Sequence, residues 1–180
     1  DFHRREKNPQ RGEKMIKDYL AANPEQPTAY RALAEFYRSL GRLDDAVEVY
    51  EQAIAAAEKT QPDDLPYLYL ALGDFYRQMS RPTDAINAVI KAQKAYGQPD
   101  KSIQRRLASY QIDFGQLPEA AATINRFKEL WPDDVRGDLL EGFLRLRQTQ
   151  TKEAIEKFSA ICKSHPDNGE AHYRLAFAQI

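Results

Sequence analysis

The side chains best suited to metal binding are one cysteine and two histidines close to the end of the sequence. Cys162 and His165 are three positions apart, and His172 follows seven positions later. Zinc sites in proteins usually combine two closely spaced pairs of ligands, and the chain has no second cysteine. We therefore expect no metal site and assign these side chains to structural roles near helix ends.

Adjacent carboxylates are the other group that could do chemistry. Asp-Asp pairs stand at 44–45, 63–64 and 133–134, and such pairs can serve acid–base catalysis or bind Ca²⁺. Each pair, however, falls at a turn or at the start of an expected helix, where carboxylates cap backbone N–H groups. The sequence has no glycine-rich phosphate loop, no G-x-S-x-G and no H-E-x-x-H motif. We expect no catalytic residues, no cofactor and no enzyme activity.

The charge balance and hydropathy of the chain argue against two further classes of partner. Lys and Arg number 26 against 27 Asp and Glu, and no long basic run occurs, so we expect no nucleic-acid partner. No apolar segment approaches the roughly 18 residues that a membrane-spanning helix needs. Recognition of RNA or a polysaccharide through Tyr67, Tyr173 and Arg105 is a weaker alternative.

An internal repeat organises the rest of the sequence. Ala46, Ala85, Ala120 and Ala154 each open an expected helix after a turn, at spacings of 39, 35 and 34 residues. Apolar residues then recur every three or four positions, which is the pattern of a helix buried on one face. The four segments are GRLDDAVEVYEQAI, SRPTDAINAVIKAQ, GQLPEAAATINRFK and TQTKEAIEKFSAIC.

A second helix precedes each of these segments and has its own signature. The same spacing of aromatic, leucine, small residue and tyrosine occurs in Tyr30, Leu33, Ala34 and Tyr37 and again in Tyr69, Leu72, Gly73 and Tyr76. Followed by alanine and a closing proline, this pattern resembles the tetratricopeptide (TPR) repeat. The resemblance implies an all-α fold, a right-handed α-α superhelix of antiparallel helix hairpins. Each hairpin of about 34 residues would bury its apolar face against its neighbours.

The periodicity, together with the prolines and glycines at the turns, predicts ten helices and no strands. We expect helices at 9–22, 28–40, 43–60, 65–79, 82–95, 100–113, 116–129, 134–147, 150–163 and 169–180. These form one domain over 1–180. Residues 1–25 hold the second helix of an incomplete repeat, 27–62, 65–99, 100–133 and 134–167 are full repeats, and 169–180 begin another. The chain starts without Met, and we expect it to be a piece of a longer protein.

Polar residues stand at expected core positions in two repeats: Gln104 and Gln111 in the third, and Asp138, Glu141 and Arg145 in the fourth. Those helices need other core residues. We expect Leu140 and Leu144 to serve in the fourth repeat, which leaves the rotation of that helix and its groove-facing residues open.

The resemblance also implies a binding surface, because the first helices of such arrays line a concave groove that holds a partner. The residues that we expect there are Arg31, Glu35, Arg38, Leu70, Asp74, Arg77, Arg105, Ser109, Ile112, Leu139, Phe143, Leu146, Tyr173 and Phe177. The arginines of this surface, with Arg106 among them, suit carboxylates or phosphates. The apolar side chains suit an apolar anchor. The competing interpretation is that the arginines are solvated and neutralised by neighbours such as Glu35 and Asp74.

The function expected from the resemblance is a protein–protein interaction scaffold that binds a peptide or helix of another protein. The alternative is a helical arm of a larger bacterial envelope or export protein, or of an enzyme. Arg31, Glu35 and Ala71 stand where the chaperone-binding members need Lys and Asn, so we expect a different partner. The regular repeats are similar to bacterial ones, which leaves cytoplasm and periplasm or envelope open. Self-association through exposed apolar helix faces is a further expectation.

Overall fold

The computed structural model describes residues 9–24 and 26–180, and this part of the chain is helical with no strand. The elements are α1 (Pro9–Ala22), α2 (Pro27–Ser39), α3 (Leu43–Thr60), the 3₁₀ turn η2 (Pro62–Asp64), α4 (Leu65–Gln78), α5 (Pro82–Tyr96), α6 (Lys101–Asp113), α7 (Leu117–Leu130), α8 (Arg136–Arg147), α9 (Thr151–Ser164) and α10 (Gly169–Ala178). The expected helices are confirmed, and their boundaries differ from the expected ones by at most two residues.

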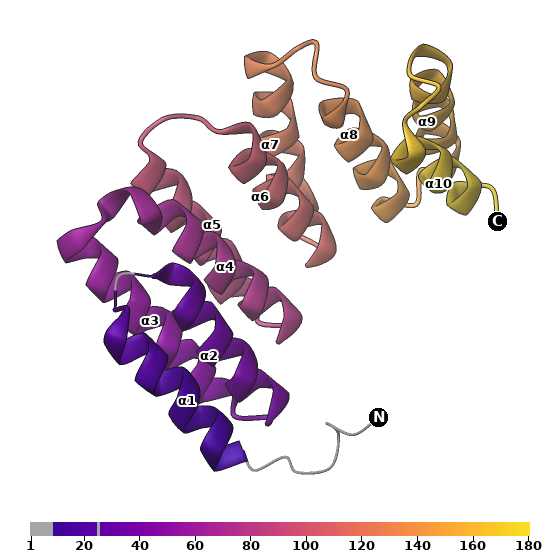
Figure 1. Cartoon of the computed structure of the whole chain (residues 1–180). Coiled ribbons are helices and arrows are strands. Elements are labelled where there is room, and N and C mark those ends of the chain that lie inside the picture. Colours follow the sequence, from indigo (N-terminus) through magenta and orange to yellow (C-terminus); the bar gives the residue numbers. More distant parts are fainter. Residues whose placement is uncertain (1–8, 25) are drawn as a thin grey trace.

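The helices form antiparallel hairpins that stack in chain order (Figure 1). The pairs are α2 with α3, α4 with α5, α6 with α7, and α8 with α9, while α1 and α10 lie at opposite ends of the stack. A helix hairpin is apolar on one side only and must bury that side against the next hairpin. The expected solenoid of antiparallel helix hairpins is therefore confirmed.

The helices begin where local chemistry favours it. Pro66, Pro82 and Pro118 lie in the first turns of α4, α5 and α7, where a backbone without an N–H loses no helical hydrogen bond. Asp100 precedes α6, and its carboxylate accepts two backbone N–H bonds of the first turn, both at 2.9 Å. These residues favour the observed starts of α4, α5, α6 and α7.

The turn inside each of the four hairpins is built in the same way. Gly41, Ser80, Gly115 and Thr149 have positive φ angles of 73°, 54°, 76° and 62°. In each turn the next residue donates its N–H to a carbonyl five residues earlier, at 2.8–2.9 Å, which closes the end of the first helix. Glycine adopts this conformation freely, whereas serine and threonine adopt it at a cost. Two of the four turns therefore carry local strain.

The first two hairpins share one continuous apolar core. The Tyr50 ring of α3 lies against the Phe75 ring of α4, with centroids 5.7 Å apart, and both side chains are buried. The same cluster extends into α6 through Ile103 and Tyr110. Burial of such aromatic rings is a large source of stability. This core joins α2 to α5 and reaches the next hairpin.

The last two hairpins are held by two smaller apolar clusters that meet at α8. Leu140 and Leu144 pack with α6 and α7, whereas the neighbouring Leu139 packs with α9 and α10. The expectation that Leu140 and Leu144 replace the missing core residues of this repeat is confirmed. Gly142 lets α9 approach closely, because a Cβ there would lie 2.6 Å from Cε1 of Phe158.

The two glutamines at expected core positions are buried and hydrogen-bonded. Gln104 Nε2 donates to Oε1 of Gln93 on α5 at 3.0 Å, and the Thr123 hydroxyl of α7 donates to Oε1 of Gln111 at 2.8 Å. A buried amide without a partner would cost about 1–3 kcal/mol. These bonds therefore allow glutamine at positions where other repeats have apolar residues.

Partly exposed charged residues form a network of ion pairs beside the core of the fourth repeat. Lys128 of α7 donates to Asp138 Oδ1 and to Glu141 Oε2 of α8, both at 2.7 Å, and Lys157 of α9 lies 2.9 Å from the same Glu141 oxygen. Burial opposes the charge on Glu141, but the two lysines overcome it and lower its pKa. Glu141 thus connects α7, α8 and α9.

The carboxylate of Glu13 links helix α1 to the first hairpin. The Tyr37 hydroxyl donates to Glu13 Oε1 at 2.8 Å, Arg42 Nη1 donates to Oε2 at 2.8 Å, and Lys17 Nζ lies 2.7 Å from Oε1. These interactions, that of Lys17 being the largest, lower the pKa of Glu13 to about 2. No side chain of α1 is fully buried, so α1 is held by these polar contacts together with the partly buried Ile16 and Leu20, which pack against the core.

Candidate functional site

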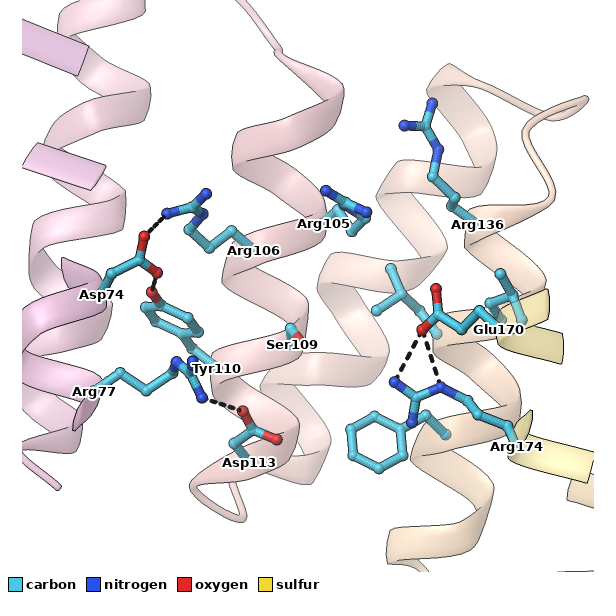
Figure 2. A pocket seen from close by; sticks show the side chains of 13 residues that line it. Asp74, Arg77, Arg105, Arg106, Ser109, Tyr110, Asp113, Arg136, Glu170 and Arg174 are labelled. Atoms are coloured by element: carbon cyan, nitrogen blue, oxygen red, sulfur yellow. Dashed lines mark hydrogen bonds and ion pairs between the residues drawn. The ribbon is translucent and has the colours of Figure 1, made fainter. Parts of the chain in front are cut away.

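A pocket of about 280 Å³ lies among α4, α6, α8 and α10. All its lining residues belong to these helices, each of which is the first helix of its repeat. Five arginines, three carboxylates, a serine, a tyrosine and three apolar side chains line it (Figure 2). We call this the groove pocket. It lies on the surface of the first helices, where we expected a partner to bind.

Two charged links join α4 to α6 on one side of the groove pocket. The Asp74 carboxylate accepts hydrogen bonds from the Arg106 guanidinium and from the Tyr110 hydroxyl. Burial, and then the bond to Asp74, raise the pKa of Tyr110. Arg77 Nη1 lies 3.7 Å from Asp113 Oδ2. Asp74, which we expected to neutralise an arginine three or four residues away, thus binds Arg106 of the next hairpin. This contact joins the two hairpins.

Two other arginines of the pocket are held by carboxylates of their own segments. Arg136 Nε and Nη2 lie 2.7 and 2.5 Å from the two oxygens of Asp134, and this contact is the main reason that the pKa of Asp134 is lowered. Arg174 of α10 donates from Nε to Glu170 at 3.0 Å, and its guanidinium carbon lies 4.3 Å from the centroid of the Phe143 ring. Both guanidinium groups are therefore fixed before any ligand binds.

Arg105 differs from the other four arginines. Its side chain is exposed, and it forms no hydrogen bond or ion pair with any residue in 9–24 or 26–180. Figure 2 shows its guanidinium on the same side of the groove pocket as those of Arg106 and Arg136. The pocket thus contains one cation that is free to bind a ligand.

The structure brings six of the fourteen expected partner-binding residues together in the groove pocket: Asp74, Arg77, Arg105, Ser109, Leu139 and Phe143. They come from α4, α6 and α8, so the site is centred on the junction of the second, third and fourth repeats. This junction is where the expected arginine-rich part of the groove meets its expected apolar part.

The other expected residues lie outside the pocket. Arg38 Nη2 lies 2.6 Å from Glu35 Oε2, so this arginine is neutralised by a neighbour, as the competing interpretation predicted. Leu70 and Leu146 are partly buried and pack against the core, and Arg31 is exposed on α2. On α10, Tyr173 is 70% exposed and Phe177 is 64% exposed.

Ile112 was expected in the groove, but the structure buries it completely. It has 0% exposure and packs with Ala108 and Ile124 in the core between α6 and α7. Its neighbour Asp113 lines the groove pocket instead. Because successive helical positions differ by about 100° around the axis, a one-residue error exchanges a buried side chain for an exposed one. Ile112 therefore belongs to the core.

Arg106, expected among the groove arginines, lines the pocket, and six further lining residues were not expected there: Tyr110, Asp113, Arg136, Leu140, Glu170 and Arg174. On α6 the lining positions are 105, 106, 109, 110 and 113, so the pocket-facing stripe is displaced by one residue from the expected one. Arg106, Leu140 and Arg174 occupy the same position in successive repeats, 34 residues apart. That periodic position was a signal that sequence reasoning could have used.

The residues considered for metal binding lie at the end of α9 and the start of α10. His165 Nδ1 is 2.9 Å from the Ser164 hydroxyl, and His172 Nε2 is 2.9 Å from the Pro166 carbonyl oxygen, while the Cys162 thiol is free and partly buried. Within the part of the chain that the structure describes, no cluster of three or more His, Cys, Asp or Glu side chains could hold a metal ion. None of the helices described has the length and apolar character that crossing a membrane requires.

Comparisons with known proteins agree with this fold. Two family models described as tetratricopeptide repeat match residues 25–98 and 70–135, which together exceed half of the chain. Solved structures are similar over most of the chain, at 15–20% sequence identity. The comparison with curated proteins gave no match.

Three of these structures illustrate the similarity. YrrB, a TPR protein with an unusual peptide-binding site, is 20% identical with a TM-score of 0.57, over 91% of this chain and 81% of that chain. A tetratricopeptide repeat protein from Parabacteroides merdae is 15% identical with a TM-score of 0.68, over 92% of this chain and 64% of that chain. TTC0263 from Thermus thermophilus is 17% identical with a TM-score of 0.62, over 95% of this chain and 90% of that chain. Similarity at this level of identity establishes the fold.

Proposed function

Because the chain belongs to the tetratricopeptide repeat family, we propose that it binds a peptide or helical segment of another protein in the groove pocket. Members of this family generally act as interaction scaffolds without catalysis of their own. The proposal adds a location to that general role, namely the surface formed by α4, α6, α8 and α10.

The observation that carries the proposal is the composition of the groove pocket. One helix from each of four successive repeats contributes to it, and none of its lining residues comes from a second helix. Four of its five arginines are already held by carboxylates. A surface that is ordered in advance loses less conformational entropy on binding, which favours affinity. YrrB supports the proposal by similarity of fold, since its description includes a peptide-binding site.

Site-specific photo-crosslinking tests the location directly. A photoreactive amino acid is placed at Ser109, in the pocket wall, and, in a control protein, at Asn125, an exposed position on the second helix α7. Each protein is irradiated in an extract of the cells that produce the chain, and cross-linked peptides are identified by mass spectrometry. We expect a defined segment of one partner to be attached to position 109 and not to position 125.

Two results would contradict the proposal. Equal cross-linking from both positions would mean that the partner does not prefer the first-helix surface. Cross-linking from position 125 alone would move the interface to the second helices.

Self-association is a second candidate, which the exposure of Tyr173 and Phe177 on α10 favours. Sedimentation equilibrium of the chain and of a Tyr173→Ser, Phe177→Ser double variant tests it. We expect the variant to be less associated than the parent chain at the same concentration. Identical molar masses for the two proteins would exclude this surface as the contact.

A further inference from the structure

The groove pocket carries an excess of positive charge, although the chain as a whole does not. Its five arginines exceed its three lining carboxylates by two charges, and by one when Asp134, the partner of Arg136, is counted as well, whereas the whole chain has a net charge of one negative. Local charge of one sign attracts ligands of the opposite sign and raises their rate of association. The pocket is therefore electrostatically complementary to a negatively charged segment.

Four of the five pocket arginines are not available as primary anchors. Arg106, Arg77, Arg136 and Arg174 are each within ion-pair distance of a carboxylate of the protein itself. Arg105 is exposed and is not paired with any of the described residues. A guanidinium presents a planar set of N–H donors that fits a carboxylate with two parallel hydrogen bonds. Such a bond at Arg105 would break no existing contact.

We infer that the partner segment is acidic and that Arg105 binds an Asp or Glu side chain within it. This inference rests on the proposed function and specifies the chemistry of the partner at the same site. Around the bound carboxylate, the paired arginines 106 and 136 reduce the cost of bringing negative charge into the groove pocket. The exposed part of Phe143, under Arg174, offers an apolar surface to a neighbouring side chain of the segment.

The three carboxylates of the pocket limit how much negative charge a ligand can carry. Asp74, Asp113 and Glu170 line the same space and repel a ligand with charge at every residue, such as a nucleic-acid backbone. A peptide can instead place one or two carboxylates beside Arg105 and keep neutral residues opposite the acidic side chains. A segment with isolated acidic residues is therefore favoured over a dense polyanion.

Selection from a display library of random 12-residue peptides tests the inference. The library is selected on the whole chain at low salt, and the frequency of Asp and Glu in the retained peptides is compared with the starting library. An enriched peptide is then labelled, and its dissociation constant is measured by fluorescence anisotropy for the parent chain and for two variants.

The variants are Arg105→Gln and the matched control Arg126→Gln, which removes the same charge from an exposed position on α7. Both replacements are good helix formers, and circular dichroism verifies that both proteins remain folded. We expect enrichment of acidic residues and a roughly tenfold or greater loss of affinity for Arg105→Gln, given the usual strength of a charged hydrogen-bonded pair. The control should change affinity by less than about twofold. Replacing the peptide's acidic residue by its amide should remove the difference between the parent chain and Arg105→Gln.

The possible failures are distinguishable. Enriched peptides without acidic residues, or equal effects of the two substitutions, would overturn the acidic assignment and leave peptide binding intact. If no peptide is enriched on the parent chain, both the acidic assignment and the proposed peptide-binding function are contradicted. The role of Arg105 as a carboxylate ligand would also be overturned if Arg105→Gln weakened the binding of the acidic peptide and of its amide form equally.

Discussion

The first two hairpins and the last two hairpins of this solenoid are stabilised in different ways. Helices α2 to α5 share one continuous apolar core that is rich in aromatic rings. Helices α6 to α10 are held by two smaller clusters, by hydrogen-bonded glutamines and by ion pairs such as those of Glu141. The groove pocket begins where the first kind of packing gives way to the second. Helices of both regions line this pocket, α4 from the first and α6, α8 and α10 from the second. The difference in packing indicates that the two regions should respond differently to the loss of a buried side chain.

Removal of one buried aromatic ring from each region is the strongest test of this difference. Phe75 is 1% exposed in the first region and Phe158 is 0% exposed in the second. We expect Phe75→Ala and Phe158→Ala each to lower the free energy of unfolding by about 3–5 kcal/mol. By hydrogen exchange, the first substitution should increase exchange throughout α2 to α5, and the second mainly in α8 to α10.

The control for both is Tyr67→Ala, which removes a ring that is 68% exposed on α4 and should cost below about 0.5 kcal/mol. If Phe158→Ala increases exchange in α2 and α3 as strongly as Phe75→Ala does, the two regions form one cooperative unit and the comparison is wrong.

A smaller effect is expected from Gly142→Ala. The new Cβ would lie 2.6 and 2.8 Å from two ring carbons of the buried Phe158 side chain, so this ring or helix α9 must shift. We expect a loss of about 2 kcal/mol by urea unfolding, since overpacking outweighs the higher helix propensity of alanine. Gly169→Ala is the matched control, because nothing lies within 4 Å of the added atom. A neutral Gly142→Ala protein would mean that the second region adjusts its packing easily.

Loss of one buried hydrogen bond should have a still smaller effect. Thr123→Val keeps the shape of the side chain but leaves Oε1 of Gln111 without its 2.8 Å donor. We expect a cost of about 1 kcal/mol in urea unfolding, and partial recovery when Gln111→Leu is added. Thr83→Val, at an exposed position of α5, should be neutral. A double variant that is less stable than the Thr123→Val single variant would contradict the assigned hydrogen bond.

The most local effect is the response of α1 to pH. The pKa of Glu13 is lowered from 4.5 to about 2 in the folded chain, so its contribution is present above about pH 4.5. That contribution is lost as the pH falls toward 2 and the carboxylate becomes protonated. We expect hydrogen exchange in α1 to increase over this range before exchange in α4 does. Glu13→Gln should remove this increase. The prediction is contradicted if, as the pH is lowered, exchange in α1 of the parent chain does not increase earlier than exchange in α1 of the variant.

The fold could be predicted from the sequence because it depends on periodic, local signals. The alanines at 46, 85, 120 and 154 and the prolines at helix starts repeat with the hairpins, and the same spacings recur in the four turns with positive φ. Even the substitution of core residues in the fourth repeat was predictable, because Leu140 and Leu144 were the apolar side chains available on that helix.

The groove pocket could be predicted only in part, because its geometry depends on helix rotation and on contacts between repeats. The carboxylate of Asp74 bonds to Arg106 and Tyr110, which are 32 and 36 residues away, so a rule based on three- or four-residue spacing assigns it to the wrong arginine. The exchange of Ile112 for Asp113 reflects a rotation of α6 that depends on its packing against α5, α7 and α8. Such a rotation is a tertiary property that a single helix does not encode.

The hydrogen-bonded glutamines have a consequence for how this array can evolve. Gln104 needs the amide of Gln93 from the preceding hairpin, whereas Gln111 needs the hydroxyl of Thr123 within its own hairpin. Duplication or exchange of a hairpin would carry the second bond along intact but would separate the first pair, leaving a buried amide without its partner. The third repeat is therefore best accommodated after a hairpin whose second helix carries an amide at the position of Gln93. A purely apolar junction would place no such constraint on the order of the hairpins.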